Sequence, residues 1–296
     1  MLVGGIEFGG TKTVVAVGQD DGTVLARDTF PTTSPVELLD RIGAFYAAQP
    51  GPIAAIGCGA FGPIVIDPAA SHYGHLLGTN KPGWSGIDLV AALDRRCGVP
   101  VHLVTDVSAA GIGEARFGQL RGIDLGVYLT VGTGIGGAIL HHGKPLPALL
   151  HPEMGHLALH RSPADRAAST CQFHANCAEG LAAGPAILAR FGQSLSHFPP
   201  DGPEIALIAD YLGQLCAAIV LMLSPQRIVI GGGVGKTPNL LELAEQAMHR
   251  QLGGYVVQSQ SAGPLLHRPE LGQDAGIIGA LCCASAKSAQ RRSEPA

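Results

Sequence analysis

Residues 4–18 read GGIEFGGTKTVVAVG, which is an apolar run, a glycine turn and a second apolar run. Apolar and β-branched residues on both sides of Gly9 and Gly10 favour two strands joined as a hairpin. A further apolar run at 23–30 extends this pattern to an opening meander of three strands. Residues 129–143, LTVGTGIGGAILHHG, again read as strand, glycine turn and strand, and therefore mark the start of a second, similar unit.

Helical and strand patterns alternate after each hairpin. Helices are predicted at 35–48, 86–97, 107–118, 178–191, 204–223, 237–252 and 275–287. Further strands are predicted at 53–58, 101–105, 125–131, 135–140, 155–159 and 227–230. This order indicates two α/β domains with mixed sheets. We expect an N-terminal domain at 1–118, joined by a C-terminal helix at about 275–290, and a C-terminal domain at 119–274.

Composition excludes several classes of protein. The chain has 296 residues, 42 glycines, 7 cysteines and a formal net charge of −4, and its scattered lysines and arginines argue against a nucleic-acid partner. The N-terminus does not resemble a signal peptide, and we expect no apolar run long enough to span a membrane. An odd number of cysteines argues against a secreted disulfide framework. We therefore expect a cytoplasmic protein, with buried free thiols at Cys58, Cys97, Cys216, Cys282 and Cys283.

Glycines gather at three places that follow apolar runs. At a hairpin tip they let bare backbone N–H groups approach a ligand and surround an anion, although each cluster could equally be a tight turn. Three clusters together favour the anion-binding interpretation. They contain Gly9, Gly10 and Thr11; Gly132, Thr133, Gly134, Gly136 and Gly137; and Gly231, Gly232 and Gly233.

Two familiar nucleotide-binding motifs are matched only in part. Gly132, Gly134 and Gly137 satisfy GxGxxG after a strand, but a second apolar strand follows where that motif needs a helix. The stretch GVGKT at 233–237 has Ile230 where a Walker loop needs glycine. Neither match is evidence for its motif.

Two acidic residues follow predicted strands. Asp106 comes directly after VHLVT, and ligand-binding groups in α/β sheets collect at the carboxyl ends of strands. Aspartate is also a favoured helix N-cap, and the two roles do not exclude each other. Glu7, beside the first glycine turn, could orient a magnesium ion or its waters near phosphates.

Residues 169–180 read STCQFHANCAEG, in which Cys171, His174 and Cys177 are evenly spaced. Thiols and imidazoles are the ligands that zinc prefers, and His156 in HPEMGH offers a fourth. With four protein ligands no position remains for an activated water, so this zinc would be structural. A redox pair is the alternative, but the cysteines do not form CxxC and the cytosol disfavours a static disulfide.

Eight segments in this order resemble the ROK family of sugar kinases, and especially its bacterial fructokinases. They are GGIEFGGTKTVVAVG, GAFGPI, TNKPGW, TDVSAAGIGEARFG, TVGTGIGGAI, HPEMGH, CQFHANCAEGLAAGPAI and IVIGGGV, and they extend over nearly the whole chain. The resemblance implies an actin- or hexokinase-like (ribonuclease H-like) α/β fold of two domains, with mixed sheets and an interdomain cleft that closes over ATP and a sugar. It also implies a homodimer.

The resemblance further implies site residues. Asp106 matches the catalytic base, and Glu153, His156 and Glu179 match sugar-binding positions. Phosphates would lie near Gly9, Gly10, Thr11, Lys12, Gly132, Thr133, Gly134 and Gly136. Adenosine would lie near Pro185, Gly231, Gly232, Gly233, Val234 and Gly235. Structural zinc, in the segment 156–177, would be bound by His156, Cys171, His174 and Cys177.

The expected activity is that of an ATP- and Mg²⁺-dependent hexose kinase, in the first place a fructokinase. Alternatives are a ROK kinase for mannose, glucose or an N-acylated aminosugar, and an inactive, zinc-stabilised sugar-binding scaffold. Sugar-responsive repressors of the family carry an N-terminal helix-turn-helix, whereas this chain begins in the first hairpin, which argues against DNA binding. The family's usual residues are replaced at Asn80, Ser108, Ala138 and Pro147. The positions of Asn80 and Pro147 could line or frame the sugar pocket, which leaves the choice of hexose open.

Overall fold

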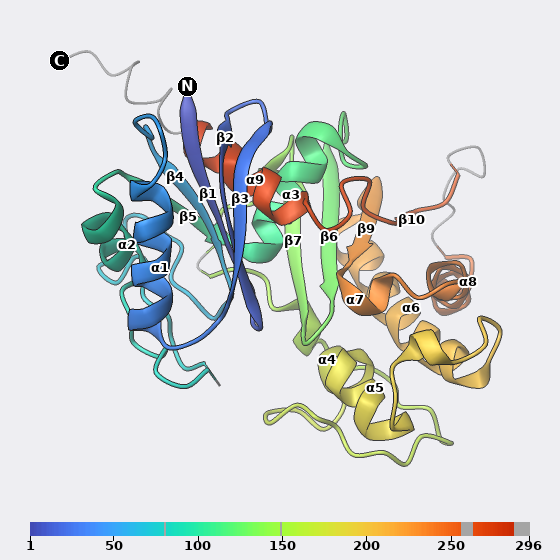
Figure 1. Cartoon of the computed structure of the whole chain (residues 1–296). Helices are drawn as coiled ribbons and strands as arrows, with labels where there is room; N and C mark the ends of the chain where they lie inside the picture. Colours follow the sequence, from blue (N-terminus) through green and yellow to red (C-terminus); the bar gives the residue numbers. More distant parts are fainter. Residues whose placement is uncertain (80, 149, 256–262, 287–296) are drawn as a thin grey trace. The chain divides into compact units, whose positions relative to one another are not determined.

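The computed structural model describes residues 1–79, 81–148, 150–255 and 263–286 (Figure 1). The chain forms two compact units, each built on its own β-sheet. The first unit contains Met1–Gly118, Lys144–His151 and the chain from Gln273 onward, and the second contains Gln119–Gly143 and Pro152–Gly272.

A five-stranded sheet in the order β3-β2-β1-β4-β5 forms the centre of the first unit. Its strands are β1 (Leu2–Phe8), β2 (Lys12–Gln19), β3 (Val24–Pro31), β4 (Ile56–Ala60) and β5 (Val101–Thr105). β2 is antiparallel to both β1 and β3, which confirms the predicted meander. β4 is parallel to both β1 and β5, so the sheet is mixed as expected.

Helices cover both faces of this sheet. They are α1 (Pro35–Ala47), α2 (Leu89–Cys97), α3 (Asp106–Phe117) and α9 (Ala275–Ala286). Ile6 and Val15 share a core with residues of α1 and α2, whereas Val3 and Val14 pack with α9. Because successive side chains of a strand point to opposite faces, a strand covered on both sides needs the nearly continuous apolar run seen here.

Part of the high glycine content serves helix packing. A Cβ atom at Gly57 of β4 would strike the carbonyl oxygen of Ala280 in α9. One at Gly279 of α9 would strike the carbonyl oxygen of Ala109 in α3. These glycines let α9 lie directly against β4 and α3, and they do not form turns.

The second unit contains the strands β10, β9, β6 and β7 in that order. They are β6 (Leu125–Val131), β7 (Ile135–His141), β9 (Arg227–Gly231) and β10 (Leu266–His267), and the two-residue strand β8 (Lys144–Pro145) follows β7 in the chain. β6 and β7 form the second predicted hairpin, and β9 lies parallel to β6 and β10. The remaining elements are η1 (Met154–His156), α4 (Ala178–Ala182), α5 (Gly184–Phe191), η2 (Leu195–His197), α6 (Pro203–Leu223), α7 (Gly232–Gly235) and α8 (Leu240–Leu252).

The helix α6 corrects one expectation. It is long and apolar enough to cross a membrane by length and composition, although no such run was expected. Its most apolar window is 61% buried, and Ile208, Leu212 and Leu215 lie in the core of the second unit. We therefore interpret α6 as a core helix, which α8 packs against.

The strand predicted at 155–159 is wrong. Residues Met154–His156 form the 3₁₀-helix η1, and Ala158 makes an isolated bridge to Cys177. The backbone of this segment hydrogen-bonds to the stretch that precedes α4 and not to a sheet edge. Periodicity cannot reveal such a partner, because it lies far along the chain.

The single helix predicted at 178–191 is also wrong. It divides into α4 and α5 at Ala183, whose φ of −72° and ψ of 164° are extended. Pro185 is the cause, since a continuous helix would bring its ring against the carbonyl of Leu181 and leave that carbonyl without a donor. Proline is instead accommodated in the first turn of α5.

Candidate functional site

Three parallel strands of the first sheet end side by side. Phe8 of β1 pairs with Ala60 of β4, and Ala60 pairs with Thr105 of β5. The first glycine turn follows β1 directly and Asp106 follows β5 directly. Because ligands of α/β sheets bind beyond the carboxyl ends of strands, this edge is where a site of the first unit is expected.

Asp106 is the first residue of α3 and not its N-cap, so the N-cap interpretation is wrong. Thr105 has the extended backbone of a cap, and its side chain accepts a hydrogen bond from the backbone N–H of Ser108 at 3.1 Å. The carboxylate of Asp106, which is partly exposed, accepts one from Val107 N at 2.9 Å. Asp106 is therefore not needed to cap the helix, and its carboxylate lies at the sheet edge.

In the first glycine turn, backbone packs closely against Gly9, whereas Gly10 has space for a side chain beside it. The N–H of Gly9 donates to the carbonyl oxygen of Lys12 at 3.0 Å, and a Cβ there would lie 2.7 Å from that oxygen. A Cβ at Gly10 would meet only the flexible end of Lys81, at 3.5 Å. The fold therefore requires glycine at the first position but leaves space for a side chain at the second.

Glu7, the penultimate residue of β1, is a partly buried carboxyl. Burial raises its pKa, against the opposing effect of the positive charges of Lys12 and Arg27. A bound cation would favour the ionised form of this carboxyl. The predicted contact with magnesium is thus compatible with its surroundings and stays a prediction.

The second glycine turn, between β6 and β7, is hydrogen-bonded to the segment that contains α4 and α5. The N–H of Gly184 donates to the carbonyl oxygen of Gly132 at 2.7 Å. The carboxylate of Glu179 accepts a hydrogen bond from Ile135 N at 2.9 Å. A Cβ at Gly134 would lie 2.6 Å from this carboxylate. No sequence pattern pointed to these two anchors.

The third glycine cluster ends β9 and forms α7, a helix of one turn. Gly232 has a φ of +84° and its Cβ position overlaps the backbone of Val131, so only glycine fits there. Gly233 is exposed, and a Cβ added to it would meet no described atom within 4 Å; Pro185 is exposed at the start of α5. The strand β7 begins at Ile135 and contains Gly137, so a strand lies where a dinucleotide fingerprint needs a helix, and the GxGxxG match is not such a fingerprint.

The four Cys and His residues predicted to bind metal come together in the second unit. One ligand atom from each of His156, Cys171, His174 and Cys177 lies within 4.8 Å of all the others. The sulfur of Cys171 is 3.6 Å from Nδ1 of His174 and 3.8 Å from Nδ1 of His156. His156 ends η1, and Cys177 is the N-cap of α4, where its sulfur accepts a hydrogen bond from Gly180 N.

This Cys/His cluster fits a tetrahedral zinc ion. Zn–S and Zn–N bonds of about 2.3 and 2.0–2.1 Å at a tetrahedral angle place sulfur and nitrogen about 3.6 Å apart, which agrees with the distances from Cys171. Burial raises the pKa of Cys177 to about 11, and a bound cation would have to displace that proton. Five other cysteines are free, of which Cys97 is partly exposed and the remaining four are buried as expected.

Three of the replaced family positions can be placed. Ser108 is buried, and its hydroxyl accepts a hydrogen bond from Thr105 at 2.8 Å, so it supports the start of α3. Ala138 is buried in β7, and Pro147 is exposed. Asn80 lies outside the described residues.

Comparison with known proteins identifies the relatives of this chain. The family model of the ROK family matches residues 3–287. A putative fructokinase of Bacillus subtilis (strain 168) is 37% identical over 96% of this chain and 95% of its own length. The fructokinase of Pediococcus pentosaceus is 36% identical over 97% of this chain and 98% of its own.

Solved structures agree with this relationship. The ROK hexokinase from Thermus thermophilus matches 98% of this chain and 100% of its own with a TM-score of 0.79 and 27% identity. A ROK glucokinase from Streptomyces griseus, solved with glucose and AMPPNP, matches with a TM-score of 0.78 at 24% identity, which is evidence for the fold alone. Together with the two mixed sheets, these matches confirm the predicted α/β, hexokinase-like fold class.

Proposed function

The chain belongs to the ROK family, and we propose that it is an ATP-dependent fructokinase, which converts ATP and D-fructose into ADP and D-fructose 6-phosphate. The observation that carries this proposal is a set of fructokinase-named relatives, 34–37% identical over 86–97% of the chain. A glucokinase of Thermotoga maritima is less similar, at 27% identity.

In this reaction Asp106 is the general base. Its carboxylate takes the proton of the sugar hydroxyl as the hydroxyl oxygen attacks the γ-phosphorus, and the bond from that phosphorus to the departing ADP oxygen breaks. The position of Asp106 beyond a strand end, released from the capping role by Thr105, supports this assignment.

Backbone N–H groups of the glycine turns supply most of the remaining assistance, by holding and neutralising phosphate charge. We assign the phosphates to Gly9, Gly10, Thr11, Lys12, Gly132, Thr133, Gly134 and Gly136. We assign adenosine to Pro185 and to the third cluster, Gly231, Gly232, Gly233, Val234 and Gly235. Magnesium, when bound, offsets charge on the phosphates, and Glu7 is the residue that would orient it or its waters.

The sugar is assigned to Glu153, His156 and Glu179, and the Cys/His cluster supports two of them directly. His156 is itself a predicted zinc ligand, and Glu179 lies in the helix that Cys177 caps. Zinc would be structural here, because the protein supplies all four ligands. We further propose a cytoplasmic homodimer, as the resemblance implies.

A coupled ADP-release assay with fructose, mannose, glucose and N-acetylmannosamine tests the function. The highest kcat/KM is expected with fructose, and phosphorus NMR of the product should identify the 6-phosphate. A higher value with another hexose would reassign the substrate. Sugar binding without ADP release from any sugar would instead support the inactive scaffold.

The first glycine turn allows a clean test of phosphate binding. Gly10→Ala is expected to raise the KM for ATP about tenfold or more, because the added Cβ obstructs the close approach of a phosphate to the backbone N–H groups. A hydrogen bond to a charged group is worth about 1.5–3 kcal/mol. The KM for fructose should change little, since the added Cβ has space in the fold. Gly78→Ala, where a Cβ meets no described atom within 4 Å, is the matched control.

The equivalent substitution in the second turn has a different expected result. A Cβ at Gly134 would collide with Glu179, so Gly134→Ala should weaken fructose binding as well as ATP binding. Titrating both variants with fructose and with an ATP analogue distinguishes the two cases. Equal losses for both ligands in Gly10→Ala would contradict the assignment of the first turn.

A further inference from the structure

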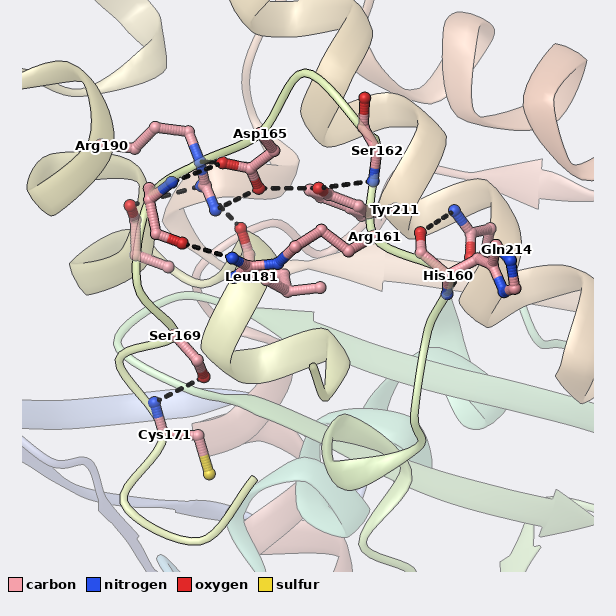
Figure 2. A network of polar contacts seen from close by, with 12 residues as sticks. His160, Arg161, Ser162, Asp165, Ser169, Cys171, Leu181, Arg190, Tyr211 and Gln214 are labelled. Carbon is pink, nitrogen blue, oxygen red and sulfur yellow. Dashed lines mark hydrogen bonds and ion pairs between the residues drawn. The ribbon is translucent and has the colours of Figure 1, made fainter. Parts of the chain in front are cut away.

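The second unit contains a buried ion pair whose residues no motif singled out (Figure 2). Arg190 of α5 donates from Nε and Nη2 to the two carboxylate oxygens of Asp165, each at 3.0 Å. Their side chains are only 6% and 1% exposed. Tyr211 of α6 donates its hydroxyl to the same carboxylate at 2.7 Å. We call Asp165, Arg190 and Tyr211 the buried triad.

The ion pair of the triad is charged at neutral pH. Burial alone would raise the pKa of Asp165, but hydrogen bonds from Arg190, Tyr211 and the N–H of Ala167 outweigh burial and hold the pKa below its usual value. A buried ion pair is often no more stabilising than apolar residues of the same volume. Its presence therefore does not by itself indicate a gain in stability, and its effect on the geometry of the segments that it joins is considered instead.

Each member of the triad also hydrogen-bonds to the backbone, and these contacts reach two segments, the loop at 162–167 and the end of α4. Tyr211 OH accepts a hydrogen bond from Ser162 N at 3.2 Å, and Asp165 accepts one from Ala167 N at 3.1 Å. Arg190 donates from Nη1 to the carbonyl oxygen of Leu181 at 2.8 Å. In a continuous helix this carbonyl would need the backbone N–H of residue 185, which Pro185 lacks.

These three backbone positions flank the metal ligands. Ser162 follows His156 in the chain, Ala167 precedes Cys171, and Leu181 follows Cys177. The triad thus hydrogen-bonds to the loop that connects His156 with Cys171 and to the end of the helix that follows Cys177. The loop at 162–167 and the end of α4 therefore meet at one buried, hydrogen-bonded group.

Local hydrogen bonds connect the segments around the triad to the metal ligands. The N–H of Cys171 donates to Ser169 Oγ at 3.2 Å, and Ser169 Oγ donates to the carbonyl oxygen of His174 at 2.7 Å (Figure 2 shows the first of these). Thr170 N donates to the carbonyl oxygen of Gly180 at 3.1 Å. The loop that bears two ligands is thereby joined to α4, which the third ligand caps.

We propose that Asp165, Arg190 and Tyr211 are positioning residues that hold the Cys/His cluster in its zinc-binding arrangement before the metal arrives. This inference rests on the part of the proposed function that assigns zinc to the cluster. Residues that orient metal ligands typically change metal affinity about 10–100-fold when they are replaced. The triad acts through backbone segments, so the lower end of that range is expected.

The test measures zinc affinity directly on the full chain. The purified protein is stripped of metal and titrated with Zn²⁺ in competition with a chromophoric chelator. Tyr211→Phe and Arg190→Lys are each expected to weaken zinc binding about tenfold. Tyr46→Phe is the matched control, because it also removes a buried hydroxyl, one that donates to Gly5 O at 2.7 Å in the first unit.

The expected result is weaker zinc binding in the triad variants, with wild-type zinc affinity in Tyr46→Phe even where its melting temperature falls. The visible spectrum of the Co²⁺-loaded protein should also change in Tyr211→Phe, because the ligand geometry relaxes. Wild-type zinc affinity and an unchanged Co²⁺ spectrum in Tyr211→Phe would overturn the inference. If Arg190→Lys does not fold, the zinc affinity and the Co²⁺ spectrum of Tyr211→Phe decide the test by themselves.

Two further outcomes separate this inference from the proposed activity. A wild-type protein that binds zinc tightly but phosphorylates no hexose refutes the kinase proposal and leaves the role of the triad supported by the affinity data. A wild-type protein that binds no zinc overturns the inference, whatever its activity with fructose.

Discussion

Asp106→Asn is expected to lower kcat about 10²–10⁴-fold, the usual cost of removing a positioned general base. The asparagine side chain cannot take a proton from the sugar hydroxyl. Its Oδ1 can still accept the hydrogen bond from Val107 N, and the loss of a negative charge in the first turn of α3 costs only about 0.3–1 kcal/mol. Steady-state rates at saturating fructose and ATP, with denaturant melts of both proteins, measure the two effects.

Thr105→Ala provides the converse control. It removes the side chain that caps α3, which should lower the free energy of unfolding by about 0.5–2 kcal/mol. It leaves the carboxylate of Asp106 in the protein. Near-normal turnover in Asp106→Asn would refute the assignment of Asp106 as the base.

Loss of the metal is expected to have the second largest effect. Cys171→Ser removes a thiolate ligand with little change in size, and stoichiometric zinc should disappear from the purified protein by elemental analysis. We expect kcat/KM for fructose to fall at least about 10–100-fold, the range seen for disturbed metal sites. Without the metal, the cluster no longer holds η1 and the start of α4 in place. His156 and Glu179, which are assigned to the sugar, lie in these two elements and would lose their positions.

Binding of an ATP analogue should persist in part. The second glycine turn is anchored to the segment of α4 and α5 through Glu179 and Gly184, so it should loosen when the cluster is lost. The first glycine turn belongs to the other unit and is closed by its own hydrogen bond from Gly9 N to Lys12 O. Cys97→Ser, at a partly exposed free thiol in the first unit, is the control that should retain zinc and activity. A zinc-free preparation with full activity would remove both the metal site and its proposed role.

Much of the site could be predicted because its signals are local. Apolar runs around Gly9–Gly10 and Gly132–Gly134 were enough to predict both hairpins, since strand and turn preferences act within a few residues. The even spacing of Cys171, His174 and Cys177 predicted their clustering for the same reason. His156 was added as a fourth ligand, and the fold brings it to the other three.

Two local features were nevertheless predicted incorrectly. The acidic residue after β5 was read as a cap or a base, and the cap proved to be Thr105, because the extended backbone of Thr105 lets its side chain reach Ser108 N. The helix predicted at 178–191 breaks at Ala183 because of Pro185, an effect that the apolar periodicity of the segment does not contain.

The sequence by itself therefore determined the two hairpins, their glycine turns and the chemical identity of the metal ligands, because these depend on residues that are neighbours in the chain. Only the tertiary structure decided that Glu179 supports the second glycine turn and that Asp165, Arg190 and Tyr211 enclose the ends of the ligand-bearing segment. Such hydrogen bonds join residues far apart in sequence. Their geometry is set by how helices and strands pack, and packing leaves no periodic trace in the order of the residues.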